Sequence, residues 1–599
     1  PKFPKDFVSY VSVGDGSVNN AHFLSATNIA DYANHRNFKC PMVFTISNNS
    51  ICISLESYDY LMNVFLKHKL SMPVYQASIY SIFEVYDQAS AAIHYARRYR
   101  SPVCFVVNDI PRRFGHAATD RQSAYMSNDR IEQVSSTERN PLCYAIHQAC
   151  TGDNPAFSFH QLAEIYQRLD EIIIDMFAQA SQEPKNDSIG RSGLISQLAP
   201  AQLAESSKKY HYYHSYYLDH HHNLTTPALS KSKHKPIKQV MRKNMTQLYD
   251  ELLTVFPNLV YVGEDVMHGG YYLVTDQLVD KHPLRVRDFP PDETSLVGAG
   301  IGYAQSGLLP IIEIPYAKYL DCGADMFFEA AILHWLSPKK VSKCNGMIIR
   351  LQGFDKGVFG GNFHTHNSLY LPPGVDVLCF SNGEDYVRGM RNAVVQAYQG
   401  RVVMVVDSTH LLNLRHVNDG DGLWLRNYPL LNSAENDQPS TLTFDEIRVY
   451  TKHTHHAVSL DKAALDNLES NTNRHVIIIS YGNGVVTSLQ ARDALIKEDN
   501  TLNVTVIDTP YLSKTPKQLE QLLRDIYPQQ FKSSTSLVFA DVCKHGQHPL
   551  AAMICTLQEK DILQSYQTWQ CVAATPTYNP LGSTITFTSV QDIIDAVHK

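Results

Sequence analysis

The sequence predicts an α/β protein that contains several parallel sheets. Short β-branched runs recur along the 599 residues, and helical patterns lie between many of them. Continuous apolar strands that alternate with helices are typical of parallel sheets covered on both faces. The length is about four times the roughly 150 residues of one domain, so we expect three or four domains.

The predicted strands are short and end in small or acidic residues. They cover residues 8–13, 42–47, 103–107, 260–262, 311–314, 347–351, 402–406, 476–480, 504–507 and 536–540. Their apolar runs are as long as those of buried strands in globular proteins. A last βαβ unit is expected to begin at His475.

Two stretches interrupt this alternation. After residue 153 a helical pattern over 162–178 is followed by a polar tract that holds residues 208–214 and the three histidines at 220–222. We interpret this tract as a linker with solvated histidines rather than a metal site, because no strand or helix is expected to hold them in place. A second stretch, near 411–474, is rich in Asn, Asp, Ser and Thr. The resulting segments are 1–155, 156–235, 236–425, an irregular connection over 426–470, and 471–599.

Composition excludes several classes of protein. Lys and Arg number 52 against 59 for Asp and Glu, a net charge of -7 without a large basic block, so nucleic acid is not an expected partner. The 11 cysteines are scattered and form no Cys-x-x-Cys pair, which favours a reducing compartment over a disulfide framework. No apolar run approaches the roughly 20 residues that span a bilayer, so we expect a soluble protein without a membrane partner.

Two short motifs lie at the carboxyl ends of predicted strands. Gly14-Asp15-Gly16 follows the first strand, and Asn48-Asn49 follows the second. Open α/β sheets bind ligands at such ends. A carboxylate and an amide oxygen about one βαβ unit apart can hold Mg²⁺ against a diphosphate. Either motif alone could be an ordinary turn, but together they indicate a metal and phosphate site.

These motifs and their neighbours, residues 13–20 and 46–54, resemble the α half of the thiamine diphosphate-dependent 2-oxo acid dehydrogenase decarboxylases. The segment from Arg112 to Asp120 is similar to the family's Arg-x-x-Gly-His-x-x-x-Asp loop, which brings His116 to the active site. The resemblance implies thiamine diphosphate and Mg²⁺ as cofactors. It assigns cofactor binding to Gly14, Asp15, Gly16, Asn49, Ile51 and Arg112, with Asp15, Asn49 and the Ile51 carbonyl as metal ligands.

The second half of the chain is similar to the β subunit of the same family. The matching segments, in order, are Val262-Gly263-Glu264-Asp265-Val266, Gly269-Gly270, Arg285-Val286-Arg287-Asp288, Asp292-Glu293, Gly298 with Gly300, Pro310-Ile311-Ile312-Glu313-Ile314, and the segment around His364. Tyr481-Gly482-Asn483-Gly484 opens what looks like a transketolase-type C-terminal domain. The resemblance implies a fused α-β chain with a thiamine diphosphate-binding fold: a diphosphate-type domain, a pyrimidine-type domain and the C-terminal domain.

The resemblance also implies roles for single residues. Glu293 matches the activating glutamate that bonds to the aminopyrimidine ring of the cofactor, although an acid beside Asp292 could simply favour a helix N-terminus. Tyr319 would stack on that ring or be a plain core aromatic. His364 and His116 would hold the substrate carboxylate and move a proton, or only orient neighbours. Glu264 and Glu313 are expected to support the pocket or to form ion pairs.

The function implied is oxidative decarboxylation of a 2-oxo acid, followed by acyl transfer to the lipoyl group of a dihydrolipoyl transacylase. Branched-chain 2-oxo acids are the first choice of substrate, as in 3-methyl-2-oxobutanoate dehydrogenase, and pyruvate and acetoin stay open. A homodimer is expected, because the family holds the two ends of the cofactor on domains from different halves. A transketolase-like enzyme is the alternative activity.

A non-catalytic paralogue that assembles with an active subunit is the alternative of another class. Lys318 stands where the family usually has Asp, Met326 where it has Gln, and Ala117 where relatives often have Ser. The chain opens at Pro1 and enters a strand almost directly, so we expect that an upstream segment is missing and that targeting cannot be read. The expected location is the cytoplasm for a bacterial source or the mitochondrial matrix for a eukaryotic one.

Overall fold

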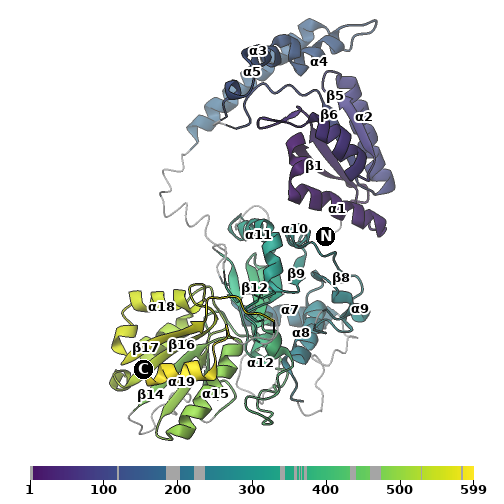
Figure 1. Ribbon diagram of the computed structural model, residues 1–599. Coiled ribbons are helices and arrows are strands. Elements are labelled where there is room, and N and C mark those ends of the chain that lie inside the picture. Colours follow the sequence, from purple (N-terminus) through teal and green to yellow (C-terminus); the bar gives the residue numbers. More distant parts are fainter. Residues whose placement is uncertain are drawn as a thin grey trace. The chain divides into compact units, whose positions relative to one another are not determined.

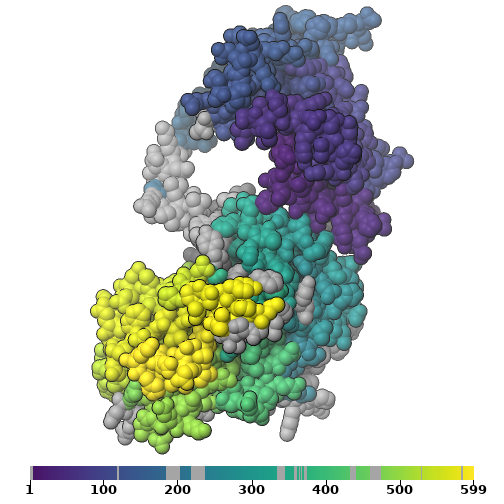
Figure 2. Space-filling model, in the orientation of Figure 1, coloured from purple at the N-terminus to yellow at the C-terminus, as the bar shows by residue number. Residues whose placement is uncertain are grey.

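The computed structural model describes most of the chain. The described residues are 4–117, 120–183, 190, 203–220, 237–270, 272–336, 344–356, 360–362, 364–365, 367–369, 374–431, 440–452, 454–458, 460, 474–527, 529–581 and 585–599. The chain divides into two compact units, Pro1–Leu194 and Ile195–Lys599, and each is described by itself. Figure 1 shows their elements, and Figure 2 shows the atoms that each unit presents in the same view.

The first unit is built on a four-stranded parallel sheet with the order β1-β2-β6-β5. The strands are β1 (Ser9–Gly14), β2 (Met42–Ser47), β5 (Val74–Ser78) and β6 (Val103–Asn108). β5 was not among the predicted strands, because Gln76 interrupts its short apolar run. In register, Gly14 pairs with Ser47 and Ser47 with Val107, so the ends that carry the two sequence motifs lie side by side.

Helices cover both faces of this sheet and continue beyond it. Phe44 and Ile46 of β2 point into one apolar cluster, and Val43 packs with Ala92 and Ala96 of α2 on the other face. The helical elements are η1 (Asp15–Asn19), α1 (Ala21–His35), η2 (Tyr60–Lys69), α2 (Ile82–Tyr99), η3 (Gln122–Ala124), α3 (Asn128–Ser135), η4 (Thr137–Arg139), α4 (Pro141–Cys150) and α5 (Phe159–Gln182). A small hairpin, β3 (Ile51–Cys52) with β4 (Leu55–Glu56), follows β2.

The second unit contains a six-stranded parallel sheet with the order β11-β12-β10-β9-β7-β8. Its strands are β7 (Leu259–Gly263), β8 (Val286–Asp288), β9 (Leu309–Ile314), β10 (Met347–Gln352), β11 (Asp376–Leu378) and β12 (Val402–Asp407). Its helical elements are α7 (Ser206–His220), α8 (Met241–Val255), η6 (Val266–His268), α9 (Leu278–Lys281), α10 (Glu293–Gln305), η7 (Ala317–Gly323), α11 (Ala324–Leu336), α12 (Gly383–Tyr398) and α13 (Thr409–Leu412). Alternate strand residues face α8 and α12 on one side, and α10 and α11 on the other.

A five-stranded sheet completes the second unit, with the order β13-β15-β14-β16-β17. Its elements are β13 (Arg448–Tyr450), β14 (His475–Ser480), α15 (Asn483–Glu498), β15 (Asn503–Asp508), α16 (Lys517–Gln521), η8 (Leu522–Ile526), α17 (Gln529–Lys532), β16 (Thr535–Lys544), α18 (Leu550–Glu559), η9 (Leu563–Ser565), β17 (Thr568–Ala574) and α19 (Val590–His598). The α/β class with parallel sheets is therefore confirmed. Among the described strands of this sheet, β13 alone is antiparallel to its neighbour, and it lies in the stretch that was expected to be an irregular connection.

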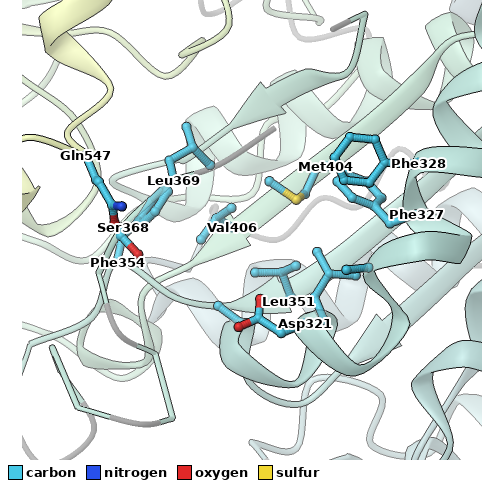
Figure 3. Close-up of a pocket in the computed structure, with 13 residues that line it drawn as sticks. Asp321, Phe327, Phe328, Leu351, Phe354, Ser368, Leu369, Met404, Val406 and Gln547 are labelled. Carbon is cyan, nitrogen blue, oxygen red and sulfur yellow. The ribbon is translucent and has the colours of Figure 1, made fainter. Parts of the chain in front are cut away.

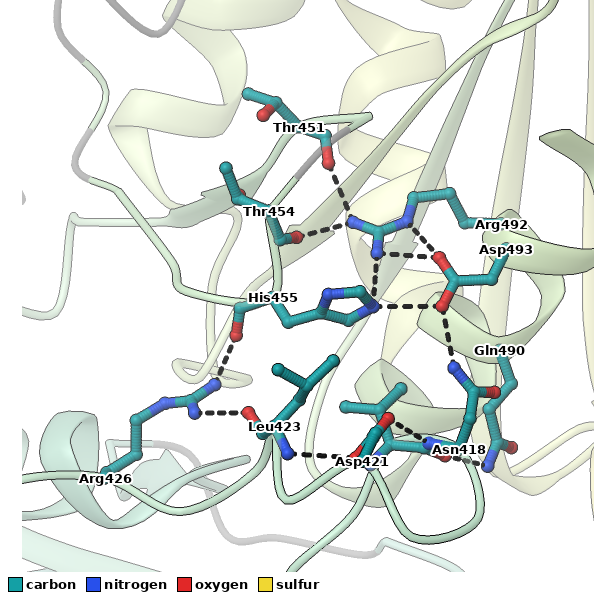
Figure 4. Close-up of polar contacts among 11 residues, drawn as sticks. Asn418, Asp421, Leu423, Arg426, Thr451, Thr454, His455, Gln490, Arg492 and Asp493 are labelled. Carbon is teal, nitrogen blue, oxygen red and sulfur yellow. Dashed lines mark hydrogen bonds and ion pairs between the residues drawn. The ribbon is translucent and has the colours of Figure 1, made fainter. Parts of the chain in front are cut away.

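Charged side chains hold the segment after β13 against α15. Arg492 donates hydrogen bonds to the carbonyls of Thr451 (2.7 Å) and Thr454 (2.6 Å), while Nε2 of His455 lies 2.9 Å from an Asp493 oxygen (Figure 4). Asn418 donates to the same Asp493 oxygen at 2.9 Å. This network explains why a polar stretch without apolar periodicity is ordered here.

Part of the expected linker belongs to the core of the second unit. Residues 206–220 form α7, in which Tyr210 and His214 are buried and His211 is exposed, so 208–214 belongs to a packed helix and not to a linker. Tyr210 donates a hydrogen bond to Glu251 of α8, and Arg391 of α12 binds the same carboxylate with two hydrogen bonds of 2.7–2.8 Å. The polar composition was misleading because the tract buries tyrosines, whose hydroxyls need buried partners. The side chain of His220, and all of 221–222, lie outside the described residues.

A second buried ion network lies inside the six-stranded sheet. Arg350 of β10 pairs with Glu313 of β9 (2.6 Å) and with Asp407 of β12 (2.7 Å), and all three side chains are at most 3% exposed. Tyr261 of β7 donates a further hydrogen bond to Glu313. Burial raises the pKa of Asp407 to about 6, and Arg350 opposes that rise. One guanidinium therefore compensates two carboxylates on the interior strands of the sheet.

Among the described residues, none of the helices is both long and apolar enough to cross a membrane.

We predict that Arg350→Met lowers the free energy of unfolding of the second unit by about 3–5 kcal/mol, because it leaves two buried carboxylates without a cation. The variant Arg350→Met/Glu313→Gln/Asp407→Asn should recover most of the loss. Urea denaturation followed by tryptophan fluorescence reports on this unit alone, since Trp335, Trp424 and Trp569 all lie in it. Equal loss in the single and the triple variant would contradict the charge argument.

Candidate functional site

The first unit places a buried carboxylate at the end of β1. Asp15 begins η1, directly after Gly14, and is 3% exposed. The Ser57 hydroxyl donates a hydrogen bond to it. A Cβ built on Gly14 would meet no atom within 4 Å, so the backbone beside Asp15 borders open space. A buried acid beside an open backbone suits a bound cation and phosphate.

The loop after β2 lies against the same residues. The side-chain oxygen of Asn49 accepts the Ile51 N–H at 3.1 Å, and Asn48 donates to Asn108 at 2.8 Å. A Cβ on Gly16 would lie 2.2 Å from the sulfur of Cys52, so only glycine fits where η1 touches this loop. The structure thus brings the Gly-Asp-Gly and Asn-Asn motifs together.

These residues fit the expected metal role. An amide oxygen has two lone pairs, so Asn49 can accept the Ile51 N–H and still bind a cation. Mg²⁺ takes oxygen ligands and usually keeps several waters. The described residues contain no group of three or more His, Cys, Asp or Glu side chains that could hold a metal, but the expected set has only one carboxylate. It therefore needs phosphate oxygens to complete the coordination shell.

The Arg112–Asp120 segment forms a closed loop. Asp120 accepts the His116 N–H (2.6 Å), the Tyr125 hydroxyl (2.7 Å) and the Arg112 guanidinium (2.8 Å). These hydrogen bonds, led by the one from the His116 backbone, lower the pKa of Asp120. Arg112 also donates to the carbonyl of Ile53, which ties the loop to the segment after Asn49. The imidazole of His116 is exposed at the tip.

The second unit places Glu293 at the first position of α10. Asp292 is the N-cap, with its carboxylate accepting the Ser295 N–H at 3.1 Å, so the capping role belongs to Asp292. Burial raises the pKa of Glu293. Gly323 of η7 packs directly on this point, since a Cβ there would lie 2.8 Å from the Glu293 carbonyl. Close packing of η7 on α10 therefore sets what Glu293 faces.

Glu264 and Tyr319 lie close to Glu293. Burial and the charges of Glu293 and Glu313 raise the pKa of Glu264 to about 7. Burial also raises the pKa of Tyr319. The charges of Tyr316, Glu264 and Glu293 raise it further, each by less than burial does. The Oε1 atom of Glu264 is buried and has no hydrogen-bond partner among the described residues. A buried acceptor without a partner, beside a second carboxyl and an aromatic ring, fits a site that takes a polar ring.

His364 joins this group through the tyrosines. Its ring packs edge-on against Tyr316 (5.0 Å between centroids) and lies 6.5 Å from the ring of Tyr319. Its Nδ1 lies 3.2 Å from the side-chain oxygen of buried Asn362, and the His364 carbonyl accepts the Lys318 N–H at 3.0 Å. Burial lowers the pKa of His364, which favours the neutral imidazole.

The site contains residues that the sequence did not single out. Tyr316 and Asn362 orient His364, and Tyr272 donates a hydrogen bond of 3.5 Å to Tyr316. Tyr272, an aromatic residue two positions after Gly270, was the available signal in the sequence.

The side chains at the two substituted positions contact other residues. Lys318 pairs with Asp321 at 2.6 Å on the surface of η7. The end of the Met326 side chain packs 3.4 Å from where a Cβ on Gly298 would lie. Neither residue has a described contact with Glu264 or Glu293. Ala117 lies in the exposed loop of the first unit.

A separate cavity of about 440 Å³ lies beside η7 in the second unit. Most of its walls are aliphatic and aromatic side chains of η7, α11, β10 and β12, and its polar lining residues are Asp321, Ser368 and Gln547 (Figure 3). Glu264, Glu293, Tyr319 and His364 do not line it. The apolar cavity and the acidic group are therefore two distinct features of this unit.

We predict that Glu264 makes the second unit less stable as pH rises. The carboxyl of the folded protein has a pKa of about 7 against an ordinary value of 4.5, so folding favours the protonated form. The free-energy cost of burying the ionised carboxyl is absent below pH 4.5 and complete above pH 7. Glu264→Gln should therefore raise the melting temperature at pH 8 and change it little at pH 4.5.

The control for this prediction is Glu329→Gln, which removes an exposed carboxyl from α11 of the same unit. Thermal unfolding followed by tryptophan fluorescence is measured at both pH values. A Glu264→Gln effect that is the same at pH 4.5 and pH 8 would show that ionisation of this carboxyl has no part in it.

Two protein families match the chain. Residues 4–188 match the dehydrogenase E1 component family, and residues 238–411 match the transketolase pyrimidine-binding domain family. The first match contains the Asp15 site, and the second contains Glu264, Glu293, Tyr319 and His364.

Several curated relatives of the chain are beta subunits of 2-oxo acid dehydrogenases or of an acetoin oxidoreductase. The chain is 27% identical over 161 residues to the beta subunit of acetoin:2,6-dichlorophenolindophenol oxidoreductase from Cupriavidus necator, covering 24% of this chain and 45% of the relative. It is 27% identical over 167 residues to the mitochondrial pyruvate dehydrogenase E1 component subunit beta-1 of Arabidopsis thaliana, which covers 26% of this chain and 44% of the relative. It is 31% identical over 128 residues to the 2-oxoisovalerate dehydrogenase subunit beta of Pseudomonas aeruginosa, which covers 20% of this chain and 34% of the relative.

The chain thus spans less than half the length of these curated relatives. The two family matches nevertheless occur in one polypeptide, in the order α-like and then β-like, and both contain the residues described above. The chain therefore carries a region similar to dehydrogenase E1 components and a region similar to transketolase pyrimidine-binding domains in a single polypeptide.

Proposed function

We propose that this protein decarboxylates a 2-oxo acid with thiamine diphosphate and Mg²⁺ and transfers the acyl group to the lipoyl group of a transacylase. The observation that carries this proposal is the group of Glu264, Glu293, Tyr319 and His364. Two carboxyls with raised pKa values, an aromatic ring and a neutral imidazole meet beyond the strand ends of a parallel sheet. Perturbed groups that converge in this way are typical of active sites.

The cofactor would supply the electron sink that amino-acid side chains lack. Asp15, Asn49 and the Ile51 carbonyl would hold its metal and diphosphate end. Glu293 and Tyr319 would hold its pyrimidine end, the tyrosine by stacking. The orphaned acceptor of Glu264 and the open space beside Gly14 support this assignment, since both features fit a group that the protein alone does not provide.

The chain's own residues would move protons around this group. Burial raises the pKa of Glu293, so its carboxyl can carry a proton at higher pH than an exposed acid and donate it to a ring nitrogen. His364 is expected to be neutral near pH 7, so its imidazole can accept a hydrogen bond or a proton from the substrate end. His116, exposed on its loop, is the second candidate for such a transfer.

We propose a branched-chain 2-oxo acid as substrate. The support is the 2-oxoisovalerate dehydrogenase subunit among the relatives, 31% identical over 128 residues. Pyruvate is the alternative substrate, because pyruvate dehydrogenase subunits are 27% identical over 167 residues and 51% identical over 59 residues. A transacylase partner is proposed because one relative is named as an E1 component, which is one part of a larger enzyme assembly. A homodimer is proposed because the two cofactor ends belong to different units of one chain. A reducing compartment, cytoplasm or mitochondrial matrix, suits the 11 cysteines, none of which forms a disulfide.

We predict that Asp15→Ala abolishes metal-dependent binding of thiamine diphosphate. The variant removes the only carboxylate of the expected ligand set, and the remaining oxygens are neutral. Titration calorimetry with the cofactor and Mg²⁺ measures this directly. The control is Asp87→Ala, which removes an exposed carboxylate from α2 of the same unit. Unchanged affinity in Asp15→Ala would mean that Gly14-Asp15-Gly16 is an ordinary turn.

We predict that Glu293→Gln keeps cofactor binding and loses decarboxylation. Glutamine preserves shape and a hydrogen bond but cannot cycle a proton, which typically costs about 10² to 10⁴ in rate. The assay is CO₂ release from 2-oxoisovalerate with an artificial electron acceptor, compared with release from pyruvate. Wild-type rates in Glu293→Gln would refute the assigned role. An inactive wild-type protein that strengthens a partner assembly would favour the non-catalytic alternative.

A further inference from the structure

Helix α5 leaves an apolar face uncovered in the first unit. No residue of the helix is buried, and all except Leu162 are exposed. The exposed fractions are 52% for Leu169, 57% for Ile173 and 63% for Met176. Large exposed apolar patches of this kind mark interaction sites rather than ordinary surface.

The helix itself is well defined. It has 24 residues and begins with a capping box, in which the Ser158 hydroxyl accepts the Gln161 N–H while the Gln161 side chain accepts the Ser158 N–H. Reciprocal capping satisfies backbone donors that an isolated N-terminus leaves open. In Figure 1, α5 runs along the margin of the first unit. Its apolar side chains therefore form a continuous and pre-formed surface.

Five apolar residues of α5 follow a heptad pattern, whereas the exposed Ile174 and Phe177 lie off it. They occur at intervals of three and four positions, at Leu162, Ile165, Leu169, Ile172 and Met176. This spacing places them on one seam, as the a and d positions of a coiled coil. Tyr166 and Ile173 widen the seam on one side. A regular seam favours a helix as the partner, because knobs on one helix fit holes on another.

The charges beside the seam select the direction of that helix. Arg168 and Asp175 lie on the flank opposite Tyr166 and Ile173, and each directly precedes a seam residue. When a second α5 runs antiparallel with Leu169 opposite Ile172, Arg168 of each copy faces Asp175 of the other. The same register places Tyr166 opposite Ile173. In a parallel pair Arg168 would face an isoleucine.

We propose that α5 docks on α5 of a second copy of this chain, antiparallel and in this register. The contact is isologous, so one two-fold axis generates both Arg168–Asp175 pairs and closes the interface. This inference does not rest on the proposed activity, because neither the cofactor nor any residue of the site takes part. It assigns an association surface to the end of the α-type domain.

The first test is photo-crosslinking in the full-length chain. The photoreactive residue p-benzoylphenylalanine replaces Tyr166, which is 69% exposed and tolerates a larger ring. Mixed nitrogen-14 and nitrogen-15 chains are irradiated, and mass spectrometry locates the adducts. We expect adducts between copies, on residues 172–176. Three results would overturn the proposal: adducts that join two residues of one chain, adducts on residues after 194, or the absence of any adduct that joins two copies.

The second test reverses the charges. Arg168→Asp and Asp175→Arg each create two like-charge contacts and should lower the crosslink yield about tenfold, whereas Arg168→Asp/Asp175→Arg should restore it. The control is Asp170→Arg, a charge reversal on the same helix that faces neither Arg168 nor Asp175 in the proposed register. Recovery in the double variant excludes simple unfolding of α5. A double variant that stays low, or a control that falls equally, would contradict the antiparallel register.

Discussion

The second unit depends on the charge balance that Arg350 provides inside the six-stranded sheet. Glu313 and Asp407 are buried beside it, and one guanidinium pairs with both at 2.6 and 2.7 Å. Glu264 lies close enough to interact with Glu313, no described cation offsets its charge, and burial with the charges of Glu293 and Glu313 raises its pKa to about 7. The sheet therefore carries two carboxylates, Glu313 and Asp407, whose charges Arg350 offsets and which support the fold. Glu264 lies beside them without such an offset, and its raised pKa suits proton chemistry.

Close packing decides how the site is arranged above that network. Gly323 lies against the backbone of Glu293, and the residues before it in η7 carry Tyr319 toward both raised carboxyls. His364 is held in turn by Tyr316 and Asn362. A side chain at position 323 would push η7 away from α10 and separate these groups. The chemistry proposed for Glu293 thus rests on a glycine that takes no part in it.

Two errors of the sequence interpretation came from polar tracts. The stretch around Tyr210 was expected to be a solvated linker, yet Tyr210 is fully buried and bonds to Glu251, which Arg391 neutralises. β13 was missed because it lies in a polar stretch and has only three residues. In both cases the partners that satisfy the polar groups lie far away in the sequence. Local composition shows what a segment contains but not what it packs against.

The sequence by itself determined the parallel α/β class, the order of α-type and β-type domains and the motif residues, because these depend on local periodicity and on short spacings. Asp15 and Glu293 could be named without coordinates. Only the tertiary structure decided which acids are compensated, that Lys318 turns to Asp321, and that His364 meets Tyr316. Burial and charge pairing arise between residues that are distant along the chain, and these two quantities set the pKa values on which the proposed chemistry depends.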